Sequence, residues 1–266
     1  MENNNSVREY YENSFNENER EGRETLEFSR SKSIISRYLS APNMNIADVG
    51  GATGAYSYWL AKMGHHVHLL DLAKNHVEIA MQKGQDTGVT LASYKCADAR
   101  ELPYESESMD MVLLMGALYH FRDKESRLKC LTEASRVLKK RGILITTIMN
   151  RYNYLISSLK YKHLIEGMGI EPIEKALTTG IIDNTEYTRL PLSYGYIPGE
   201  IVLDMNDVGF TDVNLIAVEG IANALGNNQL PEDKNEAERL LRCIELVESA
   251  PELMGVSRNI IAVGRK

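Results

Sequence analysis

Apolar residues recur along most of the chain in two patterns, short continuous runs and helical stripes. Nearly continuous apolar runs with the length of a strand occupy residues 46–49, 67–72, 89–94, 109–115 and 142–149. Three intervening segments place apolar residues three or four positions apart, as on one helix face, at residues 55–63, 74–83 and 124–138. Strands that alternate with helices in this way predict an α/β domain with a largely parallel, buried sheet.

The C-terminal third continues with further predicted helices and strands. Pro198 is typical of a first helical turn and predicts a helix over residues 198–208. A strand over 213–218, a helix that contains the stripe 240–247 and a last strand over 260–263 follow. We therefore expect seven strands in all.

Two stripes of apolar and aromatic residues precede the first strand. Their members are Val7, Tyr10, Tyr11 and Phe15 in the first, and Ile34, Ile35, Tyr38 and Leu39 in the second. Stripes at helical spacing usually form the buried side of a helix that packs on the sheet. A flap over a ligand pocket is the alternative that the pattern leaves open.

The alternation of strands and helices stops between residues 150 and 199. This stretch is rich in tyrosine, with Tyr152, Tyr154, Tyr161, Tyr187, Tyr194 and Tyr196. Tyrosine combines a large apolar ring with a hydroxyl, and both suit the wall of a ligand pocket. We predict a lid or cap at about 150–199, inserted into a single domain of residues 1–266 with an N-terminal helical segment 1–42. A cap with only a structural role is the alternative.

Charge and cysteine content narrow the class of protein. The chain of 266 residues has a formal net charge of −7, which argues against a nucleic-acid partner. No apolar run is long enough for a membrane span and the first residues do not have the order of a signal peptide, so we expect a cytoplasmic protein without a membrane partner. The three cysteines are far apart and predict neither disulfides nor a metal site: Cys96, Cys130 and Cys243.

A glycine turn follows the first predicted strand directly. Asp48 ends that strand, and Gly50, Gly51 and Gly54 form a turn from which a helix begins. The unpaired N–H groups at such a helix start suit an anionic or hydroxyl-rich ligand. Asp71 ends the second strand at the spacing where a carboxylate can accept both hydroxyls of a ribose. The match to the G-x-G-x-x-G dinucleotide pattern is poor, because alanines replace its second and third glycines.

These residues resemble the first motif of the class I S-adenosyl-L-methionine (SAM)-dependent methyltransferases, D-x-G-x-G-x-G. Here it stands as Asp48, Gly50, Ala52 and Gly54. The loop Cys96 to Tyr104 resembles the family's adenine-binding loop, and the order of elements agrees over roughly residues 7–149. The resemblance implies a Rossmann-like, seven-stranded, mostly parallel sheet with a C-terminal antiparallel strand, helices on both faces and an inserted helical lid.

The resemblance also implies the cofactor, SAM, which leaves as S-adenosyl-L-homocysteine. Gly50, Gly51 and Gly54 would hold its methionine part, with Asp48 ordering the turn. The other residues expected at the cofactor are Asp71 for the ribose, Asp98 and Ala99 for the adenine, Leu72, and Met115 at the end of the fourth strand.

The acceptor side has no motif of its own. The fourth strand would end at the transferable methyl group, so Tyr119 and His120 are the candidate catalytic residues, with His120 as a possible proton acceptor. Tyr152, Tyr194 and Tyr196 are the candidate substrate-binding residues. We expect transfer to a small-molecule acceptor, by a chain that could form a homodimer.

Three other functions compete with this prediction. A SAM-binding protein without transferase activity would carry the same cofactor motif. A nicotinamide-dependent oxidoreductase would share the fold, but the alanines of the turn and the preceding acid disfavour it. An RNA methyltransferase is disfavoured by the acidic balance of the chain.

Overall fold

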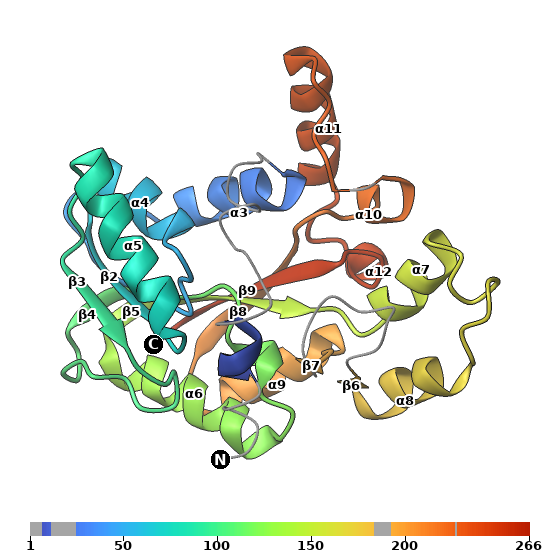
Figure 1. The fold of residues 1–266 in the computed structure, drawn as a ribbon, viewed down its shortest axis with the longest axis horizontal. Helices are drawn as coiled ribbons and strands as arrows, with labels where there is room; N and C mark the ends of the chain where they lie inside the picture. Colours follow the sequence, from blue (N-terminus) through green and yellow to red (C-terminus); the bar gives the residue numbers. More distant parts are fainter. Residues whose placement is uncertain (1–6, 12–24, 184–192, 227) are drawn as a thin grey trace.

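A seven-stranded sheet forms the centre of the molecule (Figure 1). The computed structural model describes residues 7–11, 25–183, 193–226 and 228–266. The strands, in the spatial order β3-β2-β1-β4-β5-β9-β8, are Ser93–Cys96, His66–Asp71, Asn45–Val49, Met109–Leu114, Leu138–Met149, Asn259–Arg265 and Thr211–Ala217. Strands β1 to β5 pair in parallel, whereas β9 is antiparallel to both of its neighbours. The predicted fold class is therefore confirmed.

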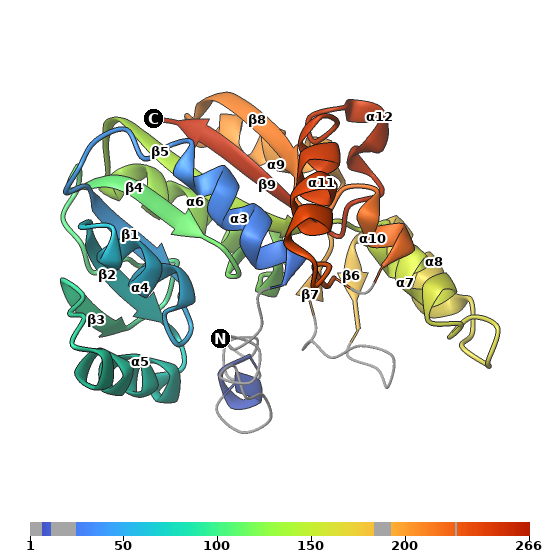
Figure 2. The same ribbon diagram turned by 90° about the horizontal axis from the view of Figure 1, so that it is seen from above.

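Helices cover both faces of the sheet (Figure 2). The helices α3 (Leu26–Ser36), α4 (Ala55–Lys62) and α5 (Lys74–Thr87) contribute to one hydrophobic cluster. The helices α6 (Lys124–Val137) and α9 (Pro198–Asp207) contribute to the cluster on the opposite face. Burial on both faces explains the nearly continuous apolar runs of the central strands. No helix in the described part of the chain is both long and apolar enough to cross a bilayer.

Several predicted boundaries differ from the structure, and those of β3, β5 and α11 have a clear structural reason. Strand β3 covers Ser93–Cys96 instead of residues 89–94, because its pairing with β2 begins only at Ser93. Strand β5 starts at Leu138, which pairs with Met109 before a register shift in the ladder. Helix α11 spans Lys234–Glu245, earlier than the stripe 240–247, because the Asp233 side chain accepts a hydrogen bond from the Glu236 amide and caps it.

The cap after β5 has a small core of its own. It contains α7 (Asn153–Lys160), α8 (Glu171–Thr179) and a short antiparallel hairpin of β6 (Ile181–Ile182) and β7 (Ser193–Tyr194). Its core residues are Tyr154, Met168, Ile173, Ala176 and Ile182. A second insertion, between β8 and β9, carries α10 (Ala222–Leu225), α11 and α12 (Pro251–Met254). Phe15 and Tyr187, which belong to predicted stripes or walls, lie outside the described residues.

Candidate active site

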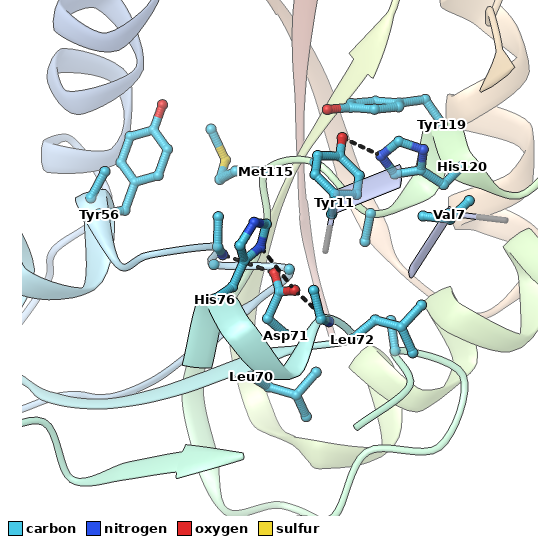
Figure 3. Close-up of a pocket in the computed structure, with 18 of the residues that line it drawn as sticks. Val7, Tyr11, Tyr56, Leu70, Asp71, Leu72, His76, Met115, Tyr119 and His120 are labelled. Atoms are coloured by element: carbon cyan, nitrogen blue, oxygen red, sulfur yellow. Dashed lines mark hydrogen bonds and ion pairs between the residues drawn. The ribbon is translucent and has the colours of Figure 1, made fainter. Parts of the chain in front are cut away.

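A cavity opens at the carboxyl edge of the sheet, where β1, β2 and β4 end (Figure 3). Parallel strands bring the residues that follow them to the same edge, so segments distant in sequence meet here. Of the predicted site residues, the following line the cavity: Gly50, Gly51, Asp71, Leu72, Asp98, Ala99, Met115, Tyr119 and His120. Two segments before the first strand add to its wall, with Val7, Arg8 and Tyr11 from the first and Thr25, Glu27 and Phe28 at the start of α3 from the second.

The glycine turn lies against the strand ends through backbone contacts that side chains would block. The amides of Gly50 and Gly51 both donate to the Leu70 carbonyl, at 2.8 and 3.1 Å. Gly50 has a φ of 73°, and a Cβ on Gly51 would lie 2.8 Å from a carboxylate oxygen of Asp48. Gly54 has a φ of 92° and caps α4 without lining the cavity. The turn is therefore shaped by packing and by left-handed backbone as well as by the ligand space in front of it.

Asp48 lies beneath this turn and is fully buried. Its Oδ2 accepts a hydrogen bond of 2.7 Å from the Ser57 hydroxyl on the first turns of α4. The structure thus places Asp48 below the turn, hydrogen-bonded to α4, and does not bring this predicted cofactor residue to the cavity surface.

The Asp71 carboxylate joins two backbone turns at the cavity. Its Oδ2 accepts from the Ala52 amide and its Oδ1 from the Ala73 amide, both at 2.9 Å, and His76 Nδ1 lies 3.3 Å from Oδ1 (Figure 3). A carboxylate offers about four lone-pair sites, so these contacts leave capacity on the carboxylate for a ligand hydroxyl. Asp71 therefore fits the ribose role implied for it.

Asp98 lies in the loop after β3 and is bound by Arg100. Its two oxygens accept from Nε and Nη2 of Arg100 at 3.1 and 2.8 Å, and this hydrogen bonding raises the pKa of the guanidinium. The bidentate pair fixes the orientation of the carboxylate. Asp98 and Ala99 remain on the cavity wall, where the adenine was expected.

The catalytic candidates follow β4 on a short 3₁₀ turn, η1 (Leu118–His120). The rings of Tyr119 and His120 are in contact, with centroids 4.5 Å apart. His120 is buried, and burial lowers its pKa to about 4, an effect that the charge of Asp71 partly offsets. The imidazole is therefore neutral at physiological pH and can accept a hydrogen bond or a proton.

Residues 7–11, the described part of the first apolar stripe, form a helical turn that covers the cavity. Of the two alternatives for this stripe, a helix packed on the sheet or a flap over a ligand pocket, this position favours the flap. The Tyr11 hydroxyl lies 3.0 Å from His120 Nε2, and Asn75 Nδ2 donates to the Tyr11 carbonyl at 3.2 Å. Val7 and Arg8 line the cavity beside Tyr11. The second stripe, on α3, packs on the sheet through Ile34 and Ile35.

The structure does not bring Tyr152, Tyr194 and Tyr196 to the cavity. Tyr152 is exposed, and Tyr194 and Tyr196 are buried in the main core, where the guanidinium of Arg127 lies 3.7 Å from the ring centroid of Tyr194. Gly195, between them, donates to the Gly180 carbonyl, so the chain here is tied to the end of α8. None of the described residues at 150–183 or 193–199 lines the cavity.

Several cavity residues with polar or aromatic side chains were not singled out as site residues from the sequence, among them Tyr11, Glu27, Phe28 and His76. They come from three segments that have no motif and meet only when the chain folds. The stripe that contains Tyr11 was the one available signal.

The chain resembles known methyltransferases in its central segment. Residues 47–146 match a family model described as a methyltransferase domain. Among curated proteins, the chain is 32% identical over 106 residues to a probable tRNA methyltransferase 9B of Mus musculus, which covers 39% of this chain and 21% of that protein. It is 29% identical over 121 residues to a ubiquinone biosynthesis O-methyltransferase of Cereibacter sphaeroides, and this match covers 44% of this chain and 47% of that protein. The chain thus spans from about a fifth to about half of these relatives.

Solved structures share the fold over most of the chain. A SAM-dependent methyltransferase of Methanosarcina mazei has a TM-score of 0.60 at 17% identity and covers 88% of this chain and 96% of its own. A SAM-dependent methyltransferase of Thermotoga maritima, titled a possible histamine N-methyltransferase, has a TM-score of 0.60 at 18% identity, with coverages of 98% and 99%. At these identities the likeness shows the fold alone.

Proposed function

Because the chain carries a class I SAM-dependent methyltransferase domain, with SAM as its cofactor, we propose that it transfers the methyl group of SAM to a small-molecule acceptor. One observation carries this proposal: a single cavity is lined both by the cofactor residues and by a second group of polar and aromatic side chains. Gly50, Asp71 and Asp98 belong to the first group, and Tyr11 and His120 belong to the second.

The two halves of the cavity meet at the end of β4. Met115 and Gly116 lie on its wall between the glycine turn and the η1 residues. A methyl transfer needs the acceptor atom in line with the methyl group and water kept away, so adjacent cofactor and acceptor spaces under one cover are what the reaction requires. Residues 7–11 and the start of α3 supply that cover.

The division of roles follows from these positions. Asp71 would hold the ribose hydroxyls, Asp98 and Ala99 the adenine edge, and the turn at Gly50 the methionine part. SAM supplies a methyl group that is already activated by its sulfonium charge. The protein then has to orient the acceptor and receive a proton, and His120 Nε2, which lies 3.0 Å from the Tyr11 hydroxyl, would be the proton acceptor.

A nucleic-acid acceptor is the second candidate, because one of the similar curated proteins is described as a probable tRNA methyltransferase. The net charge of −7 and a cavity roofed by residues 7–11 and by Phe28 favour a small acceptor. The two candidates separate by incubating the protein with methyl-labelled SAM and either total tRNA or a low-mass metabolite extract. Label recovered in the tRNA fraction alone would contradict the small-molecule proposal.

Cofactor binding is tested with the Asp71→Ala variant. Loss of charge-assisted hydrogen bonds to two hydroxyls costs about 1.5 to 3 kcal/mol, so S-adenosylhomocysteine should bind at least about tenfold more weakly by calorimetry. Asp86→Ala, at an exposed position of α5, is the matched control and should bind normally. Unchanged affinity in a folded Asp71→Ala variant would sink the assignment of the cofactor half. Binding without turnover on any acceptor fraction would instead favour a SAM-binding protein without transferase activity.

A further inference from the structure

The side chain of Tyr11 occupies the acceptor side of the cavity. Its hydroxyl reaches His120 Nε2 at 3.0 Å, the atom that would receive the acceptor's proton (Figure 3). Tyr11 comes from the helical turn of residues 7–11, which is separated from His120 by 109 positions in sequence. A phenol of the chain itself therefore lies where a substrate hydroxyl would be expected.

The side chain of Tyr11 has aromatic and apolar neighbours, and we call the space that it fills among them the slot. The Tyr11 ring meets the imidazoles of His76 and His120 edge to face, with centroids 5.5 and 5.4 Å apart and interplanar angles of 65° and 86°. Aromatic pairs prefer such edge-to-face arrangements. Leu72 and Phe121 add apolar surface to the same cavity. The slot thus combines two aromatic walls, an apolar lining and one hydrogen-bonding nitrogen.

We propose that the acceptor is a phenol, whose ring takes the slot of the Tyr11 side chain and whose hydroxyl takes its place at His120 Nε2. This inference rests on the proposed methyl transfer and specifies its acceptor. Tyr11 then acts as an internal competitor, which fills the slot until an acceptor displaces it. The nearly complete burial of His120 restricts this position to a group that enters the cavity.

The step balances without any additional reactant. The phenol oxygen forms the new C–O bond, the S–CH₃ bond of the sulfonium breaks with its electron pair remaining on sulfur, and the O–H proton passes to His120 Nε2. The phenolic proton becomes strongly acidic as the methyl group arrives, so a weakly basic, neutral imidazole is sufficient to receive it. The products are an aryl methyl ether and a thioether.

Binding of p-cresol, which is the tyrosine side chain without its backbone, tests the slot directly. In the cofactor-free Tyr11→Ala variant the slot is vacated, and calorimetry or ligand-observed NMR should show p-cresol binding at least tenfold more tightly than to the unaltered protein. Toluene has the ring without the hydroxyl, and 4-methylcyclohexanol has the hydroxyl without the flat ring. Both should bind more weakly than p-cresol, and equal binding of all three would overturn the proposal.

Further variants locate the binding site. Tyr11→Ala combined with His120→Asn should lose most of the gained affinity for p-cresol, whereas Tyr161→Ala, an exposed tyrosine of the cap, should not gain any. If the affinity for p-cresol rises as much in Tyr161→Ala as in Tyr11→Ala, p-cresol binds elsewhere and the proposal is wrong.

Enzyme turnover provides a second measurement, which does not depend on p-cresol filling the space left by the Tyr11→Ala substitution. Tyr11→Phe keeps the ring but removes the competing hydrogen bond, so KM for phenolic acceptors should fall by about two- to tenfold. A rise in KM would show that the Tyr11 hydroxyl helps to bind the acceptor, and would overturn the proposal that Tyr11 competes with it. Methylation of a non-aromatic acceptor but of no phenol would overturn this inference while leaving the proposed function intact. Loss of both S-adenosylhomocysteine binding and all transfer would defeat the proposed function itself.

Discussion

His120 combines a position suited to proton transfer with an environment that keeps it neutral. Burial is the main cause of its lowered pKa of about 4, compared with 6.5 for the free side chain. Below pH 6.5 the unfolded chain binds a proton at this residue while the folded protein does not, so stability falls as the pH is lowered from 6.5 towards 4. The same shift keeps the imidazole available as a proton acceptor throughout that range.

The His120→Asn variant tests both consequences. At pH 5 the unaltered histidine should lower the free energy of unfolding by roughly 2 kcal/mol relative to pH 7.5, and the variant should lack this component in urea denaturation. His163→Asn, on a histidine of the cap, is the control. Turnover of the His120→Asn variant should fall by at least about a hundredfold if Nε2 receives the proton, while S-adenosylhomocysteine affinity holds. Turnover within a few-fold of the unaltered protein would make His120 structural.

At the scale of elements, the cover of the cavity is the segment 7–11, whereas the cap is bound to the main core. The Arg151 guanidinium donates to the Gly195 carbonyl, the Tyr194 hydroxyl and both oxygens of Glu200, at 3.0 to 3.1 Å. These contacts join the start of the cap to β7 and to α9. The segment 7–11 is held to α5 through Asn75 and contacts η1 through Tyr11. Covers that open for ligands belong to the less stable parts of a fold.

Hydrogen exchange distinguishes the two elements. Addition of S-adenosylhomocysteine should slow exchange at residues 7–11 and 25–28, because they line the cavity, and should leave α7 and α8 nearly unchanged. The Asp71→Ala variant under the same conditions is the control and should show little slowing. Slower exchange in the cap with none at residues 7–11 would instead support a lid at 150–199.

At the scale of the whole molecule, a buried arginine ties the cavity wall to the C-terminal insertion. Arg30 on α3 is fully buried, and it donates to the Val218 carbonyl at 3.2 Å, to Glu245 at 3.3 Å and to Glu248. Arg37, one third exposed, binds Glu248 as well. Burial alone would raise the pKa of Glu248, but hydrogen bonds from Arg37 and Arg30 hold it below its usual value. The start of α3 reaches the cavity, so this network holds part of its wall.

Replacing Arg30 by methionine should destabilise the protein strongly. Removing one partner of a buried ion pair costs about 3 to 5 kcal/mol, and the partial exposure of the two glutamates favours the lower end of that range. Arg37→Met is the matched control on the same glutamate and should cost less than about 1 kcal/mol, because exposed pairs contribute little. Urea denaturation measures both, and equal losses would contradict a special role for the buried arginine.

The sequence by itself determined the fold and several residues of the cavity wall. The apolar runs and helical stripes could be assigned because the central strands are buried on both faces, and the residues that follow parallel strands must meet at one edge. Gly50 and Asp71 could be named from this rule before their contacts were known, whereas Asp98 and His120 were named from the resemblance to the methyltransferase family. Strand pairing with β2 and the capping of α11 by Asp233 corrected only boundaries.

Only the tertiary structure decided what covers the cavity. A stripe such as Val7 and Tyr11 predicts a buried helix face but does not say what buries it, because the partner surface is chosen by packing across more than a hundred residues of chain. The tyrosines of the cap were expected to line a ligand pocket but do not. Tyr194 and Tyr196 contact Arg127 and lie in the core, and β7, which contains Tyr194, pairs with β6. Residue type and spacing limit what a side chain can do, whereas the direction in which it points depends on every element packed around it.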